Sequence, residues 1–181
     1  MDTMKDRTKM MFAQALMKAI EDKELSKVRV QELCRLCGTD RQTFYYHFRD
    51  KYDLVAWIYE GDLKDTFLAE PSTPSVEQIT FLLHRLKRKQ FFYSKAFQDM
   101  TQNSLFTYMH IVNCQITESI ARERTGGRQL TERERFSIKF VSYAWVCCIA
   151  EWINQKCTPA PEIFADYLSS NYFFAHPDFR E

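Results

Sequence analysis

Residues 31–51, QELCRLCGTDRQTFYYHFRDK, constrain the fold of this chain more than any other part of its sequence. Leu33, Cys34 and Cys37 follow the i, i+3, i+4 spacing of a helix that buries one face. Gly38 comes directly after them, and glycine adopts the left-handed conformation that ends many helices at little steric cost. The stretch therefore predicts two short helices joined by a tight turn.

The second helix of this pair has an apolar side and a polar side. Asp40 precedes it as the expected N-cap, because its carboxylate can accept a backbone N–H from the first turn. At about 100° per residue, Phe44 and Phe48 fall close together, while Gln42 and Tyr46 point nearly the opposite way. The outward side chains are Arg41, Gln42, Thr43, Tyr45, Tyr46 and His47. Such a face suits a DNA major groove, where amides and hydroxyls meet base edges and cations meet phosphates.

The sequence CGTDRQTFYYHFRDKYDL resembles the helix-turn-helix of TetR-family transcriptional regulators, whose pattern is G-V-S-x-x-T-x-Y-x-H-F-x-x-K. The matching residues are Gly38, Thr43, Tyr45, His47, Phe48 and Lys51. Thr39 and Asp40 replace a small apolar residue and a serine, and Arg29 stands where many members have a hydroxyl residue. The resemblance implies a motif over about residues 29–48 in a DNA-binding domain of residues 1–50. It also implies a C-terminal effector-binding and dimerisation domain of residues 51–181.

The same resemblance implies a homodimer that binds a double-stranded DNA operator. We expect the contacts to come from Arg41, Gln42, Thr43, Tyr45, Tyr46, His47 and Lys51. Lys51 lies in the first turn of the next helix, where a phosphate meets both an ammonium group and the helix dipole. The stretch also resembles a subgroup of activators of dihydroxyacetone kinase genes. Two partners for the C-terminal domain therefore stay open: an unknown small-molecule effector or a protein coregulator.

The composition favours an all-α protein, with about nine helices. Hydrophobic residues make up 45% of the 181 residues and aromatic residues 15%, which suffices for a core and for lining a cavity. The chain has 4 Gly and 5 Pro, and no alternating strand pattern bounded by turn signals recurs. The net charge is +1, but residues 1–51 hold 11 Lys and Arg against 8 Asp and Glu. A modest positive excess thus accompanies the helix pair.

The sequence predicts a soluble, cytoplasmic protein with no membrane segment. No long apolar run follows the basic N-terminal residues, and no stretch approaches 18 consecutive apolar residues. Cys34, Cys37, Cys147 and Cys148 lie in apolar helical contexts, so we expect mostly reduced, buried thiols. The sequence lacks a glycine-rich phosphate loop, G-x-S-x-G and H-E-x-x-H. We therefore expect neither an enzyme nor a cofactor.

Further helices are predicted from caps and apolar spacing. They cover about residues 5–22, 104–122, 131–155 and 162–174, with another that starts near residue 75. Asp50 is expected to cap a fourth helix that ends near Leu68, and Pro71 and Pro74 mark the boundary before the body. Two capping boxes pair Ser75 with Gln78 and Thr131 with Glu134. The basic residues 84–90, HRLKRKQ, are interpreted as a solvated helix end rather than a second nucleic-acid site.

The C-terminal body contains candidates for an effector pocket. They are Phe92, Phe106, Met109, His110 and Tyr143, which either line a cavity or pack in the core. His110 and Cys114 lie four residues apart, a spacing that places two metal-binding atoms on one helix face, with His84 as a conceivable third. No second pair completes the site, so we expect no metal and a packed cysteine beside a hydrogen-bonded histidine. The last two helices, 131–155 and 162–174, are expected to form a four-helix dimer interface.

Overall fold

The computed structural model describes residues 4–64, 74–99, 101 and 104–174 of the chain. The elements in these ranges are all helical: α1 (Met4–Ala19), the 3-10 turn η1 (Leu25–Lys27), α2 (Val30–Cys37), α3 (Arg41–His47), α4 (Lys51–Leu63), α5 (Val76–Arg88), α6 (Gln90–Phe97), α7 (Leu105–Arg124), α8 (Glu132–Asn154) and α9 (Pro161–Phe174). The all-α prediction and its count of nine α-helices are confirmed for the described part of the chain. The predicted end of the fourth helix near Leu68 and the predicted break at Pro71 lie outside the described residues.

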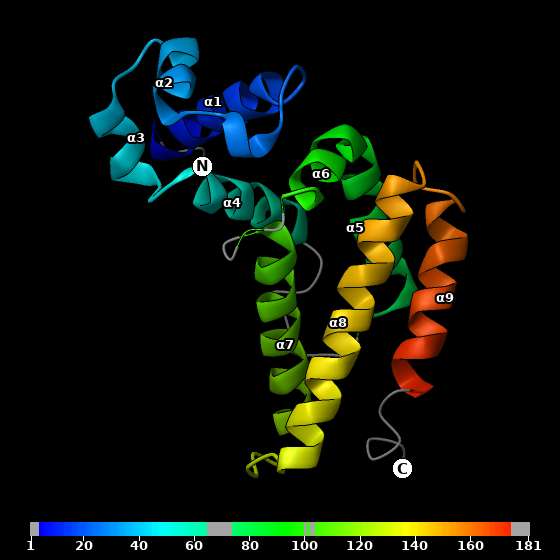
Figure 1. Cartoon of the computed structure of the whole chain (residues 1–181). Coiled ribbons are helices and arrows are strands. Elements are labelled where there is room, and N and C mark those ends of the chain that lie inside the picture. Colours follow the sequence, from blue (N-terminus) through cyan, green and yellow to red (C-terminus); the bar gives the residue numbers. More distant parts are fainter. Residues whose placement is uncertain (1–3, 65–73, 100, 102–103, 175–181) are drawn as a thin grey trace.

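Helices α1–α3 form a head at one end of the molecule, and α5–α9 form a body (Figure 1). Helix α4 leads from the head into the body, where α7 and α8 run side by side as a long antiparallel pair. Helix α9 packs on α5. The two parts are therefore joined through a single helix that belongs to both.

Local signals in the sequence set the ends of the head helices. Gly38 follows α2 in the left-handed conformation, with φ +63°, as predicted. The Asp40 carboxylate accepts the Thr43 N–H at 2.7 Å and caps α3. Asp50 accepts the N–H groups of Tyr52 and Asp53 at 2.8 and 2.9 Å and caps α4. These three caps fix the short turn between α2 and α3 and the start of the connecting helix.

Aromatic rings form the centre of the head core. Phe12 of α1 is fully buried, and its ring meets the ring of Phe44 edge-on at 5.1 Å between centroids. Phe48 lies 5.7 Å from Phe44 and also meets Phe12 edge-on. Leu16 of α1 and Ile20, which directly follows the helix, are also buried and continue this core. Burial of the two phenylalanines of residues 40–48 confirms the predicted apolar side of that helix.

Capping boxes begin two body helices, as predicted. Ser75 and Gln78 exchange hydrogen bonds at the start of α5. Thr131 and Glu134 do the same at the start of α8. Hydrogen bonds from Arg128 and from the Thr131 backbone hold the pKa of Glu134 at about 2. The start of each helix is therefore specified by its own sequence.

Helix α8 is long and apolar enough, by length and composition, to cross a membrane. Its buried face packs against α6 and α7, as the core helix of a soluble body does. The opposite face is exposed and carries Cys147 and Cys148. Two of the four cysteines expected to be buried are therefore exposed, while Cys34 is buried and Cys37 half-buried. Apolar spacing alone cannot tell a core face from a face left open for a partner.

Candidate functional site

Helix α3 presents its polar side to solvent. Tyr46 is 68% exposed and Tyr45 49% exposed, whereas Phe44 and Phe48 are buried beneath them. Arg41 and Gln42 are exposed, and Thr43 and His47 are half-buried. The structure thus brings six of the seven predicted DNA-contacting residues onto one accessible helix.

Side chains from α1 flank the C-terminal end of α3. The Lys5 ammonium lies 5.4 Å from the centre of the Tyr46 ring, and the Lys9 ammonium lies 5.7 Å from the Phe48 and Trp57 rings. Burial, together with the charges of Lys9 and Lys5, lowers the pKa of His47. His47 is therefore a neutral imidazole at pH 7, and the positive charge beside it comes from α1.

Lys51, the seventh predicted residue, makes contacts that the sequence did not indicate. Its ammonium group donates to the backbone carbonyls of Ser26 at 2.6 Å and Val28 at 3.1 Å. Burial lowers the pKa of Lys51. Two of its three N–H donors thus tie the η1 turn to the start of α4, which leaves one donor for the predicted phosphate contact.

A basic groove that sequence reasoning missed lies beside the N-terminal end of α3. Its charged lining is Lys23, Lys27, Arg29, Glu32, Arg35, Asp40 and Arg41. Two of the five cations are in ion pairs: the Lys23 ammonium with the Glu32 carboxylate at 2.7 Å and the Lys27 ammonium with the Glu24 carboxylate at 3.3 Å. The cations come from three different elements, so they form no basic run in the sequence. Their only sequence signal is the charge excess of residues 1–51.

The last turn of α4 is held to the body by a buried carboxylate. Asp62 is 5% exposed and accepts hydrogen bonds from the Lys89 ammonium at 2.7 Å and the Tyr93 hydroxyl at 2.5 Å. The Arg85 guanidinium donates to the backbone carbonyls of Gly61 and Asp62 at 3.3 and 3.1 Å. These donors satisfy the end of α4 and complement the negative end of its dipole. Burial and the adjacent Asp62 raise the pKa of Tyr93 well above its usual value.

The first turn of α4 is also linked to both parts of the molecule. Next to Lys51, the Tyr52 hydroxyl donates to the Asp99 carboxylate of the body at 3.0 Å. In the last turn of α4, Glu60 accepts the hydroxyl of Tyr108 from α7. Helix α4 is therefore bonded to the head at its start and to the body along its length.

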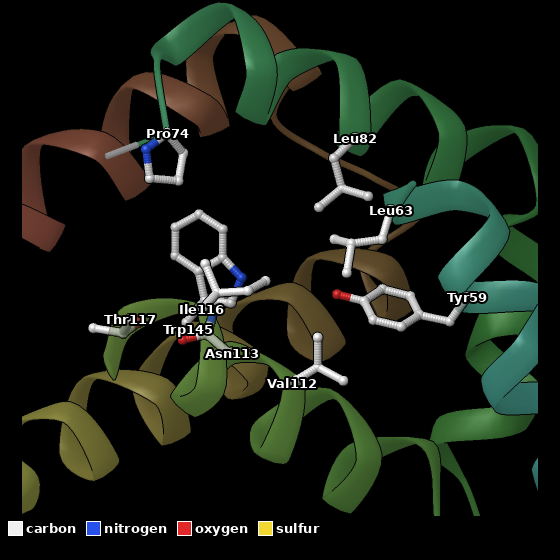
Figure 2. Close-up of a pocket in the computed structure, with 9 residues that line it drawn as sticks. All are labelled: Tyr59, Leu63, Pro74, Leu82, Val112, Asn113, Ile116, Thr117 and Trp145. Carbon is white, nitrogen blue, oxygen red and sulfur yellow. The ribbon is translucent and has the colours of Figure 1, made fainter. Parts of the chain in front are cut away.

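A small cavity lies between α4, α5, α7 and α8 (Figure 2). Its lining residues are Tyr59, Leu63, Pro74, Leu82, Val112, Asn113, Ile116, Thr117 and Trp145. The volume is about 20 Å³, which holds one water molecule. A drug-sized ligand needs several hundred Å³. This cavity is therefore too small for a drug-sized ligand as it stands.

None of the five predicted pocket residues lines this cavity. Phe92 and Met109 are buried in the main core, and Met109 lies one turn before Asn113 on α7. His110, Phe106 and Tyr143 instead gather between α7 and α8. The His110 ring stacks on Tyr143 at 3.7 Å between centroids, and Phe106 stacks on Tyr143 at 6.2 Å. Ring stacking fills the space that these residues were expected to leave open.

His110 is a hydrogen-bonded core histidine. One ring nitrogen, Nδ1, lies 2.9 Å from the Ser142 hydroxyl, and burial lowers the pKa of the imidazole. The Cys114 sulfur lies 3.9 Å from Nδ1 of the His110 ring. His84 is on a different helix, α5, where it pairs with Glu162 of α9 at 2.7 Å. Among the described residues no group of three side chains is placed to hold a metal ion.

The basic residues 84–90 mostly serve internal contacts. His84 pairs with Glu162 of α9, Arg85 binds the end of α4, and Lys89 pairs with Asp62. Lys87 and Arg88 are exposed at the end of α5. Three of these five basic side chains therefore join body helices to each other or to α4.

Comparison with known sequences gives two family matches. Residues 14–58 match the family described as bacterial regulatory proteins, tetR family. Residues 75–172 match the family described as transcriptional regulator C-terminal region. The chain belongs to the TetR family of transcriptional regulators. It is a DNA-binding transcriptional regulator of a non-enzymatic family, as the helix-turn-helix motif predicted.

One activator and one repressor of known structure resemble this TetR-family chain. The dhaKLM operon transcriptional activator DhaS of Lactococcus lactis subsp. lactis is 25% identical over 91 residues, which are 50% of this chain and 49% of DhaS. The chain thus matches about half the length of this curated relative. A solved structure of the dihydroxyacetone kinase operon activator DhaS has a TM-score of 0.63 at 19% identity and covers 96% of this chain and 98% of its own. NalD, the secondary repressor of the MexAB-OprM multidrug efflux pump in Pseudomonas aeruginosa, has a TM-score of 0.52 at 16% identity over 94% and 97%.

At identities of 19% and 16%, the structural similarity shows that the fold is shared. The shared fold covers both the head and the body. The similarity to activators of dihydroxyacetone kinase genes, predicted from residues 37–54, is confirmed by both comparisons.

Proposed function

We propose that this TetR-family regulator acts as a homodimer that places α3 of each copy in the DNA major groove. The exposed polar side of α3, with its phenylalanines buried beneath, is the observation that carries the DNA-binding part. Basic groups at both ends of α3 suit the phosphates on either side of the groove: Lys5 and Lys9 at one end, and Lys27, Arg29 and Arg41 at the other. A regulator of bacterial DNA works in the cytoplasm, and we propose that location.

An apolar stripe along α8 supports the dimer. Phe136 is 69% exposed, Phe140 63% and Tyr143 48%, and Cys147 continues the same row at helical spacing. On α9, Ile163 and Tyr167 are also about half exposed. A contiguous exposed apolar face of this kind marks an interaction surface. In a two-fold dimer the apolar face of one copy packs against the same face of the other copy. The two α8–α9 pairs then form the four-helix interface.

Two-fold pairing also fixes the distance between the two α3 helices. Half-sites in DNA lie about 34 Å apart, or a multiple of this, for dimers of the helix-turn-helix class. We propose that the dimer has two conformations, one in which the distance between the two α3 helices matches the half-site spacing and one in which it does not. An effector bound in the body shifts the population from one conformation to the other. Helix α4 carries the shift, because it is bonded to the head through Lys51 and to the body through Asp62.

Replacing Phe140 with lysine is expected to make the protein monomeric and to weaken operator binding by at least tenfold. The charged group would be buried in the interface without a partner, which costs several kcal/mol. Sedimentation equilibrium measures the mass, and fluorescence anisotropy with selected DNA measures the affinity. Phe91→Lys on α6, where the native ring is 50% exposed, is the matched control and should stay dimeric. A Phe140→Lys protein that remains dimeric would exclude the α8 interface.

Replacing Tyr46 or Gln42 with alanine is expected to relax sequence preference on α3. Loss of a base contact weakens the binding free energy for the preferred operator by about 1–3 kcal/mol and changes the binding of other DNA little. Lys27→Ala serves as the comparison, because a lost phosphate contact weakens all sequences alike and reduces the salt slope by about one. Binding to selected and random duplexes at several salt concentrations separates the two effects. Equal losses on both duplexes for Tyr46→Ala and Gln42→Ala would contradict base reading.

A body that docks a protein coregulator instead of a small molecule is the second candidate. The narrow cavity of about 20 Å³ favours it, because that volume is too small for an effector molecule. Native mass spectrometry with candidate partners and calorimetry with small ligands distinguish the two candidates. A stable complex with a second protein, together with no heat from any small ligand, would support the docking function.

A further inference from the structure

The ammonium group of Lys51, at the start of α4, is enclosed by groups of its own chain. It donates to the backbone carbonyls of Ser26 at 2.6 Å and Val28 at 3.1 Å. The ring of Tyr52 lies beside it, with its centre 5.3 Å from the nitrogen. An ammonium group has three N–H donors, so a phosphate bound by Lys51 would have to share them with these three groups.

Two carboxylates also act on this ammonium group. Burial lowers the pKa of Lys51, and the charges of Asp99 and Asp50 partly oppose that lowering. Asp99 is 8% exposed, and its carboxylate accepts the Tyr52 hydroxyl at 3.0 Å. A phosphate that approached Lys51 would also approach these two negative charges, which repel it. The surroundings of Lys51 thus favour a bond within the protein over a phosphate contact.

The two carbonyls that Lys51 binds lie on either side of an exposed cation. Ser26 and Val28 are the chain neighbours of Lys27, whose side chain is 69% exposed, and Arg29 follows as the N-cap of α2. Lys27 and Arg29 both line the basic groove beside α3. Because Lys51 holds the backbone on both sides of Lys27, it fixes the position from which these two cations reach outward.

We propose that Lys51 is a positioning residue for DNA binding: it holds residues 26–29 so that Lys27 and Arg29 meet the phosphates, and it contacts no phosphate itself. This inference rests on the proposed phosphate contacts of Lys27 and Arg29 and explains how the fold prepares them. A mobile segment would lose conformational entropy on binding DNA, whereas the bonds to Lys51 order it beforehand. Lys51 therefore strengthens binding to every DNA sequence alike.

NMR of the lysine ammonium groups in the wild-type protein tests which atoms Lys51 binds. Couplings across hydrogen bonds are measured from Lys51 Nζ to the carbonyl carbons of Ser26 and Val28, and from Nζ to the phosphorus nuclei of selected DNA. We expect both carbonyl couplings in the free protein and in the DNA complex, and no phosphorus coupling. A phosphorus coupling, or carbonyl couplings that are absent from the free protein or from the complex, overturns the inference.

A cycle of variants tests which cations Lys51 acts through. Lys51→Met keeps the length of the side chain without its donors, and it should weaken binding to selected and random duplexes alike by about tenfold. When Lys27→Ala and Arg29→Ala are already present, the same change should have little further effect, because the cations that it positions are gone. An equal loss in both backgrounds, with the salt slope reduced by about one each time, would refute the inference and indicate a direct phosphate contact.

Two measurements separate positioning from a general loss of folding. Backbone order parameters of residues 26–29 should fall below about 0.6 in Lys51→Met, while those of α1–α3 stay near about 0.85. Lys18→Met, at an exposed position of α1, should leave both the order parameters and the DNA affinity unchanged. Unchanged order parameters in Lys51→Met contradict the inference. If Lys51→Met does not fold, the couplings in the wild-type protein decide.

The same experiments distinguish failure of this inference from failure of the proposed function. DNA binding that depends on Lys27 and Arg29, with an independent loss from Lys51→Met, refutes the positioning role and leaves the proposed function standing. If Lys27→Ala and Arg29→Ala together do not weaken DNA binding, the proposed phosphate contacts fail. The positioning role then fails with them, whatever couplings Lys51 shows.

Discussion

Replacing Phe44 with alanine is expected to unfold the DNA-binding head and abolish DNA binding. The ring is fully buried and contacts Phe12 and Phe48 from two sides. Removing a buried phenylalanine ring costs about 3–5 kcal/mol, because the transfer free energy is lost and a cavity remains. The head is three short helices, so this loss is a large part of its stability. Urea unfolding followed by circular dichroism, with anisotropy on selected DNA, measures both effects.

Tyr45→Ala is the matched control for this experiment. Tyr45 neighbours Phe44 on α3 but is 49% exposed, so its removal should change the free energy of unfolding by less than about 1 kcal/mol. The body should keep its helical signal in both variants, since its core is formed by α4–α9. A Phe44→Ala head as stable as the Tyr45→Ala head would show that the aromatic cluster does not hold α3 in place.

The second large effect is expected at the buried carboxylate of α4. Lys89→Met leaves Asp62 buried, with the Tyr93 hydroxyl as its remaining side-chain partner. Removing one partner of a buried ion pair lowers the free energy of unfolding by about 3–5 kcal/mol. For Lys89→Met we expect a loss of about 3 kcal/mol, because the Lys89 side chain is 33% exposed. Chemical denaturation of the full-length protein at pH 7 measures the loss.

The double variant Asp62→Asn with Lys89→Met distinguishes an ion pair from general packing. It removes both charges, so it should recover most of the stability lost in Lys89→Met alone. Lys87→Met, at an exposed position two residues earlier, should have little effect. If the double variant is less stable than Lys89→Met, the two charges do not form the coupled pair that the 2.7 Å distance indicates.

These experiments bear on regulation as well as on stability. Helix α4 has 13 residues and is about 20 Å long at 1.5 Å per residue. Lys51 holds its first turn to the head, and Asp62 holds its last turn to the α5–α6 corner. A rigid helix fixed at both ends transmits displacement from one end to the other. In the proposed function, the positioning of the head thus depends on bonds made at the far end of α4.

The sequence by itself determined the parts of the molecule that depend on neighbours within one helical turn. Gly38 ends α2 in the left-handed conformation, with its N–H bonded to carbonyls of the preceding turn. Asp40 and Asp50 begin α3 and α4 by accepting backbone N–H groups two or three residues further on. The two sides of α3 also follow from spacing, since Phe44 and Phe48 lie four residues apart. The resemblance to the family was carried by this same short stretch, whereas the family matches extend over residues 14–58 and 75–172. Local hydrogen bonds and helical periodicity need no knowledge of tertiary contacts.

Only the tertiary structure decided which distant residues meet. Lys51 binds carbonyls 23 and 25 residues away, and Asp62 binds side chains 27 and 31 residues away. The cavity takes its walls from four helices, and none of the five pocket candidates inferred from sequence is among its lining residues. Periodicity shows which face of a helix is buried, but the packing angles between helices determine what that face touches.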